Sequence, residues 1–239
     1  MKFFEKNELK HLWFFYIERF LSHLLFFAPA FWVIYFQQYL SLFQIGIIFA
    51  ACSISNFIFE IPTGAVADIY GRKFSVLLGY FLTALAVLLL FFFHDFVMLI
   101  LIFFLWGIAE TFVSGAKEAW VVDNLNYNKK KGLVKEFFIK EQSIIMFSLF
   151  LSGLLGAYIV SKSSLNIIWI FAALSYFLTA IILLFIKEHK ITREKKKKQI
   201  QKHKWVGLNF LKKAARLYPP PNASLNIIKN VATMIKKRT

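Results

Sequence analysis

Long, mostly apolar stretches separated by short polar segments dominate the amino-acid sequence. Three of them, residues 74–93, 142–161 and 163–186, contain no Asp, Glu, Lys or Arg and are 20 to 24 residues long. An α-helix needs about 20 predominantly apolar residues to cross the hydrocarbon core of a bilayer. The pattern therefore predicts a transmembrane helix over each of these three ranges.

The longest uncharged stretch, residues 20–59, is too long for a single crossing. The polar segment 37–41 divides it, so we predict one helix over residues 12–36 and a second over residues 42–67. A further helix is predicted over residues 96–122, although charged residues lie within it. Six helices are thus expected in residues 1–186, with short connections between them.

Small residues recur every fourth position in two of these helices. Ser75, Gly79 and Thr83 form one row, and Ser152 and Gly156 form another. Helices in lipid pack best where small side chains let their backbones approach closely. The rows therefore predict a helical bundle and carry no information about a substrate.

The composition supports a membrane protein. Hydrophobic residues make up 59% of the 239 residues, against roughly 45–50% in soluble globular chains, and 30 residues are phenylalanine. The mean hydropathy is +0.60. A soluble fold could not bury so much apolar surface. The sequence also excludes a secreted domain held by disulfides, because Cys52 is the single cysteine in the chain.

Positive charge is concentrated at the end of the chain. Residues 187–239 hold 16 of the 29 Lys and Arg residues but two acidic ones, a net charge of +14, which leaves residues 1–186 at +2. We therefore divide the chain into a six-helix transmembrane domain, 1–186, and a basic cytoplasmic tail, 187–239. Apolar residues at helical spacing between Trp205 and Tyr218 predict an amphipathic helix on anionic lipid. Nucleic acid is not an expected partner, because no recognition motif accompanies the basic residues.

Lys and Arg are distributed unequally between the two sets of loops. The predicted loops at 37–41 and 94–95 contain none. The opposite set includes the pair at 72–73, the lysines of 129–135 and basic residues near both termini. Since positively charged loops stay in the cytoplasm, both termini are predicted to be cytoplasmic in a multi-pass protein of the cell membrane.

Polar and charged residues lie inside three of the predicted helices. A charge in the hydrocarbon is costly, so such residues usually face a partner or a water-filled cavity. Their spacing on each helix places them along one face. We interpret them as a candidate pathway for a substrate or a proton, formed by Glu18, Arg19, Asn56, Glu60, Glu110 and Lys117.

A structural interpretation stays open for part of this set. Glu18 and Arg19, like Lys117 and Glu118, are neighbouring charges near the predicted cytoplasmic ends of their helices. Local ion pairing and snorkelling would explain them without a transport role. Glu110 lies about 22 Å along its helix from the opposite end, at 1.5 Å per residue. That depth favours a functional role for Glu110.

The loop between the second and third predicted helices combines two glycines with an acid and two bases. These residues are Gly64, Asp68, Gly71, Arg72 and Lys73. Gly64 allows close contact between helices, and Gly71 allows a tight turn. The guanidinium of Arg72 can form a forked pair with a carboxylate.

This segment resembles the cytoplasmic signature of the major facilitator superfamily, G-x-x-x-D-[RK]-x-G-R-[RK], although Ile69 stands where a basic residue is usual. The resemblance covers residues 1 to about 190. It implies that Asp123, at the end of the fourth predicted helix, pairs with Arg72. It also implies a gating role for the cytoplasmic motif, which comprises Gly64, Asp68, Gly71, Arg72, Lys73 and Asp123.

The resemblance further implies the fold. It predicts an all-α membrane protein whose six transmembrane helices form two inverted three-helix repeats, a major-facilitator-like half. Superfamily members usually enclose their substrate between two such halves. We therefore expect a second six-helix half, either a twin copy or a separate chain, unless the gene is truncated. Residues 187–239 would then be the central linker.

The expected function is transmembrane transport of a small-molecule substrate by alternating access, as in a secondary transporter, with coupling to a proton or another ion left open. The sequence contains no metal-ligand cluster, catalytic triad or phosphate-binding loop, so we predict neither a cofactor nor an enzyme. The alternative is a non-transporting membrane interaction or scaffold protein that retains the half-bundle. The polar rows on the helices discriminate the two functions, because a scaffold does not need to keep them hydrated.

Overall fold

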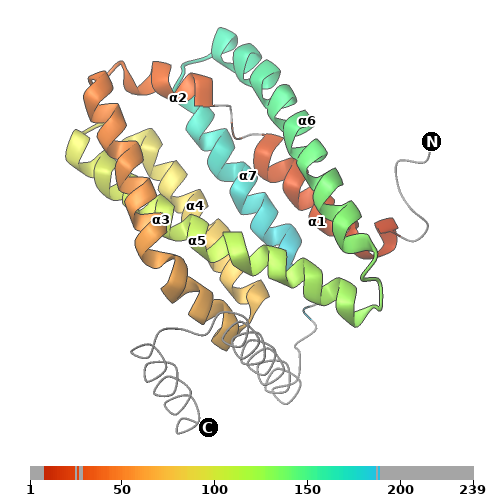
Figure 1. The fold of residues 1–239 in the computed structure, drawn as a ribbon. Coiled ribbons are helices and arrows are strands. Elements are labelled where there is room, and N and C mark those ends of the chain that lie inside the picture. Colours follow the sequence, from red (N-terminus) through yellow and green to blue (C-terminus); the bar gives the residue numbers. More distant parts are fainter. Residues whose placement is uncertain (1–7, 25, 27–28, 187, 189–239) are drawn as a thin grey trace, which may run out of the picture. The chain divides into compact units, whose positions relative to one another are not determined.

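The computed structural model describes residues 8–24, 26, 29–186 and 188, which lie within one compact unit, Met1–Lys190 (Figure 1). This part of the chain contains no β-strand. Five of its helices, α3 to α7, are long and apolar enough to cross a membrane. The helices are α1 (Glu8–Leu24), α2 (Pro29–Phe36), α3 (Leu42–Tyr70), α4 (Arg72–Phe92), α5 (Phe96–Tyr127), α6 (Leu133–Lys162) and α7 (Ile167–Leu184).

The predicted basic tail falls, apart from Glu188, outside the described residues. Its predicted amphipathic helix on anionic lipid falls outside them too. The division at residue 186 and the properties of the tail therefore stay predictions.

The first predicted transmembrane helix is divided in the structure. The range 12–36 contains α1, which ends at Leu24, and α2, which begins at Pro29. Proline is disfavoured inside a helix because it lacks an N–H group, but its fixed φ suits the first helical position. One continuous helix over 12–36 is therefore wrong. With 17 and 8 residues, neither α1 nor α2 alone has the roughly 20 residues of a complete crossing. The two-repeat arrangement of six helices accordingly stays a prediction.

Polar residues fix where two of the long helices begin. The hydroxyl of Ser41 accepts a hydrogen bond from the backbone N–H of Gln44, whose side chain accepts one from the backbone N–H of Ser41. This reciprocal pair is a capping box at the start of α3. Asp95 likewise caps α5 by accepting hydrogen bonds from the backbone N–H groups of Val97 and Met98. The chain thus turns at both polar segments that the sequence singles out.

α5 and α6 extend furthest beyond the ranges that hydrophobicity predicts. α5 continues to Tyr127, and α6 begins at Leu133 rather than at residue 142. Lys and Glu are good helix formers, so a helix does not have to end where the apolar stretch ends. As a result Lys140 and Glu141 lie inside α6, where their side chains can face other helices.

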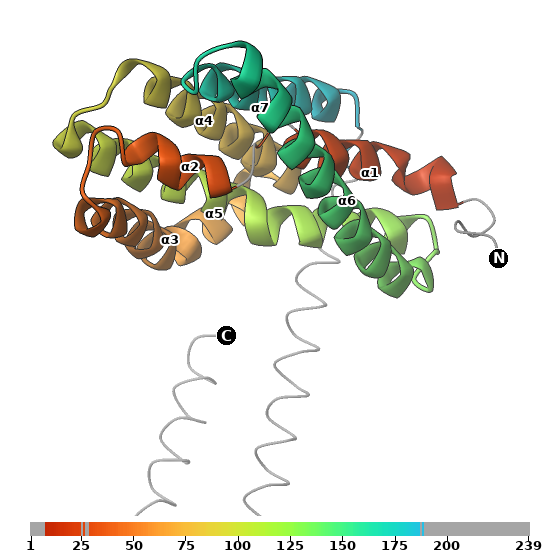
Figure 2. The same ribbon diagram turned by 90° about the horizontal axis from the view of Figure 1, so that it is seen from above.

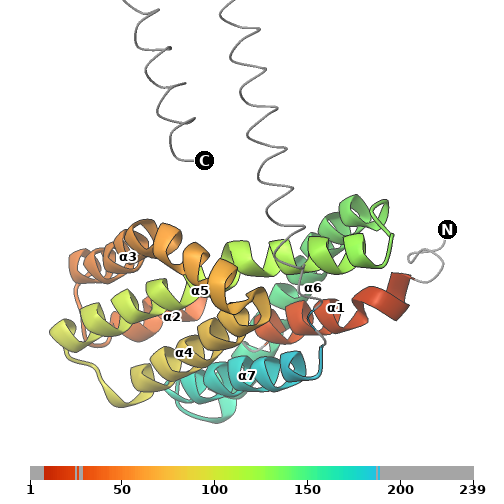
Figure 3. The same ribbon diagram turned by 90° about the horizontal axis from the view of Figure 1, so that it is seen from below.

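The order of helix contacts differs from the order of helices in the sequence. α5 packs against both α3 and α4, α4 packs against α7, and α1 packs against both α7 and α6 (Figures 2 and 3). α3 and α6 are the least buried of the five long helices. This arrangement brings polar residues of α1, α5 and α6 together, although they are more than a hundred residues apart in some cases.

The row of small residues on α4 marks a close helix contact. Ser75, Gly79 and Thr83 are all buried. The Ser75 hydroxyl donates a hydrogen bond of 2.8 Å to the carbonyl oxygen of Phe112 on α5. The prediction that this row marks a packing surface is confirmed.

Aromatic rings fill the space between α2, α5 and α7. Trp32 and Phe36 of α2 are buried together with Phe103 of α5 and Trp169 of α7. The ring centroids of Phe36 and Trp169 lie 5.6 Å apart, and those of Phe36 and Phe103 lie 5.5 Å apart. These contacts anchor the short α2 to the long helices.

Candidate functional site

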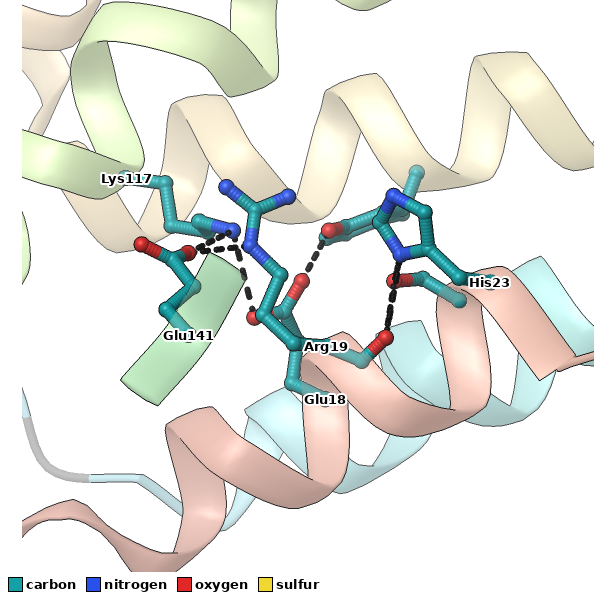
Figure 4. Close-up of polar contacts among 7 residues, drawn as sticks. Glu18, Arg19, His23, Lys117 and Glu141 are labelled. Carbon is teal, nitrogen blue, oxygen red and sulfur yellow. Dashed lines mark hydrogen bonds and ion pairs between the residues drawn. The ribbon is translucent and has the colours of Figure 1, made fainter. Parts of the chain in front are cut away.

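Four charged side chains from three helices meet inside the bundle. The Nζ atom of Lys117 on α5 lies 3.4 Å from Oε2 of Glu18 on α1 and 3.2 Å from Oε1 of Glu141 on α6 (Figure 4). Glu141 also accepts a hydrogen bond from Nε of Arg19. We call Glu18, Arg19, Lys117 and Glu141 the charge cluster. Its two acids and two bases sum to zero charge.

Apart from Arg19, which is 20% exposed, the charge cluster is almost inaccessible to solvent. The side chains of Glu18, Lys117 and Glu141 are 0%, 1% and 7% exposed. Glu18 additionally accepts a hydrogen bond from the hydroxyl of Tyr80 on α4. Buried charges are tolerated when each has an opposite charge and further hydrogen bonds. The cluster therefore ties α1, α4, α5 and α6 together.

The charged residues of α1 form their ion pairs with residues of other helices. Glu18 contacts Lys117 rather than pairing with Arg19, and Arg19 contacts Glu141. Consecutive residues on a helix point in directions about 100° apart and do not face each other. Glu118 lines a cavity whose wall also includes Arg19.

Glu141 is a cluster member that the sequence reasoning missed. The uncharged stretch predicts a helix that begins at residue 142, whereas Glu141 lies inside α6. A signal was present in the row of Ser152 and Gly156. Continued backwards at helical spacing, this row passes Ser148 and reaches Glu141, and all four residues are buried. Extending the row would have placed Glu141 on the packed face of α6.

A second buried ion pair joins the beginning of α1 to α6. Lys140 Nζ lies 2.6 Å from Oε2 of Glu8, and the hydroxyl of Tyr16 donates a hydrogen bond of 2.6 Å to the other oxygen of Glu8. Glu8 is fully buried. Together with the charge cluster, this pair holds α1 and α6 along much of their contact.

A cavity of about 340 Å³ opens beside the charge cluster, between α1, α4, α5 and α7. We call it the α1–α5 cavity. Its charged and polar wall includes Arg19 and His23 of α1 and Glu110, Ser114 and Glu118 of α5. The three residues of α5 are spaced four apart, so they form one row along the helix.

The polar rows of α3 and α5 meet at the edge of this cavity. The side-chain amide of Asn56 on α3 donates a hydrogen bond of 3.1 Å to Oε2 of Glu110. Glu60 lies elsewhere, on the wall of a smaller cavity of about 210 Å³ that Asp68 and Arg72 also line. The structure thus brings Arg19, Asn56 and Glu110 to one site.

The remaining members of the predicted pathway lie apart from that site. Glu18 and Lys117 are buried within the charge cluster and do not line the α1–α5 cavity. Glu60 is exposed on α3. The six candidate residues therefore occupy the buried cluster, the wall of the α1–α5 cavity and the wall of the smaller cavity, and Ser114 lines both cavities.

The loop after α3 contains the contact that the motif implies. Arg72 Nη1 lies 2.5 Å from Oδ2 of Asp123 at the end of α5, and it also donates to the carbonyl oxygen of Ala119. The side chains of Arg72 and Asp123 are 26% and 20% exposed. This ion pair joins the beginning of α4 to the end of α5.

Glu188 adds a contact to this loop that the sequence reasoning did not anticipate. Its carboxylate accepts hydrogen bonds from the backbone N–H groups of Arg72 and Lys73, at 2.7 and 3.3 Å, at the N-terminus of α4. A negative charge is favoured there by the helix dipole. Lys73 in turn donates hydrogen bonds of 2.6 Å to the carbonyl oxygens of Leu184 and Ile186.

The two glycines of the motif differ in their surroundings. Gly71 has φ +114°, a conformation that other residues rarely adopt, and a Cβ atom there would lie 2.9 Å from Oε2 of Glu188. The tight turn predicted at Gly71 is confirmed. A Cβ atom at Gly64 would have nothing within 4 Å. The close helix contact predicted at Gly64 is therefore wrong within the described residues.

We expect Arg72→Ala to destabilise the protein by about 2 kcal/mol, and Lys73→Ala by clearly less. Removing Arg72 leaves the Asp123 carboxylate at a half-buried site without that partner, which costs less than the roughly 3–5 kcal/mol of a fully buried pair. The hydrogen bonds of the Lys73 ammonium group go to backbone carbonyl oxygens, so its loss leaves no carboxylate at hydrogen-bond distance without a partner. Thermal unfolding of both purified variants in detergent measures the difference. Equal, small losses would contradict a special role for the Arg72–Asp123 pair.

Comparison with known proteins gives two matches. A family model described as Major Facilitator Superfamily matches residues 13–234, which extends beyond the six-helix region into the basic tail. The Bacillus subtilis (strain 168) protein named "Uncharacterized MFS-type transporter YxaM" is 30% identical over 96 residues, or 40% of this chain. That match spans 24% of the length of the relative.

Proposed function

Because the chain belongs to the major facilitator superfamily, we propose that it moves a small solute across the membrane by alternating access. Membership of the superfamily and the distant transporter relative support transport and point to a non-enzymatic protein. The chain is a multi-pass membrane protein with five helices long enough to cross a bilayer.

The α1–α5 cavity is the observation that supports this function best. Its wall holds Arg19, Glu110 and Glu118, and these residues lie in helices that are otherwise largely apolar. Such groups are expensive in lipid, so their presence supports a hydrated site for a solute. We assign the binding of the solute, or of a coupled proton or other ion, to Glu110 with its neighbour Asn56.

A second six-helix half would cover the face that carries this cavity. Glu60, Glu110 and Glu118 are exposed on the described residues taken by themselves. An acid left in hydrocarbon costs on the order of 2–4 kcal/mol by insertion scales. We propose that the second half, in the same or another polypeptide, faces these residues and completes the transport pathway.

The cytoplasmic motif is proposed to act as a gate. The Arg72–Asp123 pair links α4 to α5, and Glu188 links the same turn to the segment after α7. Alternating access requires helix ends to move relative to one another. Gly64, Asp68, Gly71, Arg72, Lys73 and Asp123 would hold the cytoplasmic ends of α3, α4 and α5 in one state and release them in the other.

The proposed orientation places both termini and the motif loop in the cytoplasm of the cell. In a Cys52→Ser background, a membrane-impermeant maleimide added to intact cells should label Ser41→Cys. It should label Tyr70→Cys only after the membrane is permeabilised. Both positions are exposed in the structure, so burial does not hide either one. The reverse labelling pattern would overturn the orientation.

Alternating access is tested by the accessibility of Ser114, without knowledge of the substrate. Ser114 is exposed and lies on the walls of both cavities. In a Cys52→Ser background, Ser114→Cys should react with an impermeant thiol reagent in right-side-out and in inside-out vesicles of the native membrane. The reason is that the cavity opens to each side in turn.

The matched control is Phe81→Cys on α4, which is exposed on the apolar surface of the same bundle. A lipid-facing position should react from neither side. If Ser114→Cys reacts from one side only, or from neither, alternating access is wrong. That result would favour the scaffold function.

A further inference from the structure

We propose that the α1–α5 cavity binds an organic cation that carries apolar or aromatic substituents. This inference rests on the proposed function, since it names the class of solute for the same cavity. Two observations carry it: the net charge on the wall of the cavity and the aromatic side chains that complete the wall.

The one basic Lys or Arg side chain that lines the cavity within the described residues is already neutralised. Arg19 contacts Glu141, and Lys117 contacts both acids of the charge cluster, so the cluster carries no net charge. Figure 4 shows the cluster beside His23, whose Nδ1 lies 2.9 Å from the hydroxyl of Ser22 and 3.0 Å from the carbonyl oxygen of Arg19. The cluster therefore does not offer an anion a free positive charge.

Two acids remain on the wall of the cavity. Glu110 accepts a hydrogen bond from the neutral side chain of Asn56, and neither Glu110 nor Glu118 has an ion pair within the described part of the chain. The lining residues from α4 and α7, such as Tyr80 and Tyr176, carry no charge. The wall thus presents two carboxylates that have no basic partner within the described residues and that a cationic ligand can neutralise.

Aromatic rings complete the cavity wall. Phe26, Tyr80, Trp106 and Tyr176 all line it. The rings pack on one another, with centroids 6.2 Å apart for Phe26 and Trp106 and 6.1 Å apart for Tyr80 and Tyr176. Aromatic faces attract ammonium groups, most strongly where water is excluded. Carboxylates beside clustered rings favour an alkyl or aryl ammonium ion over an anion.

The two acids are two helical turns apart on α5, about 12 Å along the helix axis. Ser114 lies between them on the same face. The rings and the acids are therefore distributed over a cavity of about 340 Å³, which is within the range of small-molecule sites. A ligand of one aromatic ring and one quaternary ammonium group matches both features.

Two probes of equal shape test the charge requirement. By calorimetry, we would titrate 3-hydroxyphenyltrimethylammonium, and its uncharged isostere 3-tert-butylphenol, into the protein in nanodiscs, purified with any second half that is bound to it, and subtract the heat from empty nanodiscs. We expect saturable binding of the cation and about tenfold or more weaker binding of the isostere. Equal binding of the two probes, or no saturable binding of the cation to folded protein, would overturn the proposal.

Variants locate the site. Glu110→Gln and Glu118→Gln should each raise the Kd of the cation about tenfold, and the double variant should abolish binding. Glu136→Gln removes the same charge at a position outside the cavity and should leave the Kd unchanged. An equal loss in Glu136→Gln would refute the site. If Glu110→Gln fails to fold, Glu118→Gln and the isostere still decide the question.

The result of the cation-binding experiment can be distinguished from the result of the Ser114→Cys accessibility experiment. Cation binding with one-sided accessibility of Ser114→Cys would support the site and refute alternating access. Two-sided accessibility without cation binding would keep the transport function and refute the proposed class of solute.

Discussion

Replacing Lys117 by methionine is expected to cost about 3–5 kcal/mol of stability, which is a large share of the roughly 5–15 kcal/mol of a typical domain. Methionine fills a similar volume but removes the charge. Glu18 and Glu141 would then be left buried without the ammonium group that lies 3.4 and 3.2 Å from them. The melting temperature of the purified variant, and the fraction recovered as monodisperse protein, measure the loss.

A control variant and a compensating second substitution accompany Lys117→Met. Lys135→Met removes the same charge from an exposed position on α6 and should change stability by less than about 0.5 kcal/mol. Adding Glu18→Gln to Lys117→Met leaves Arg19 paired with Glu141 and restores a cluster without net charge. The double variant should therefore regain most of the lost stability. A Lys117→Met protein as stable as the native one would show that the cluster does not hold the helices together.

Gly107→Ala is the second substitution with a large expected effect, a loss of about 3 kcal/mol. A Cβ atom at Gly107 would overlap the Ser55 hydroxyl oxygen and the carbonyl oxygen of Cys52 on α3. The Ser55 side chain could rotate, but the backbone of Cys52 could not move without separating α3 from α5. Overpacking of this kind typically costs about 1–3 kcal/mol, and the backbone contact places Gly107 at the upper end.

Gly115→Ala is the matched control on the same helix. A Cβ atom at Gly115 would have nothing within 4 Å, and alanine is favoured over glycine inside a helix by up to about 1 kcal/mol. The two substitutions are therefore expected to change the melting temperature in opposite directions. If both substitutions destabilised the protein to a similar extent, the loss would not come from the contact of Gly107 with α3, and the prediction would be wrong.

Much of the secondary structure follows from local sequence. The apolar stretches place α3, α4 and α7 within four residues of their observed ends, because a helix that crosses a membrane needs about 20 apolar residues. The prediction of one helix over residues 12–36 is wrong because hydrophobicity carries no information about backbone geometry. In the structure a new helix begins at Pro29. The beginning of α6 was misplaced because charged residues continue a helix as readily as apolar ones.

The composition of the candidate site was only partly accessible from the sequence. Helical spacing identified the rows that contain Asn56 and Glu110, and the family motif implied the contact of Arg72 with Asp123, which the structure contains. Spacing along one helix describes a face but not what lies opposite it. The contacts of Glu141 and Glu188 could therefore not be predicted, because each of these residues contacts charged or polar groups of another segment.

By itself the sequence determined that this is a helical membrane protein with polar rows on its helices, since hydrophobic length and helical spacing are local properties. Only the tertiary structure decided which charges neutralise one another. Lys117 contacts acids from positions 18 and 141, and that choice depends on α1, α5 and α6 packing side by side. The same packing leaves Glu110 and Glu118 without a basic partner in the described residues. The net charge of the α1–α5 cavity is thus a property of the fold, because it depends on contacts between residues far apart in the chain.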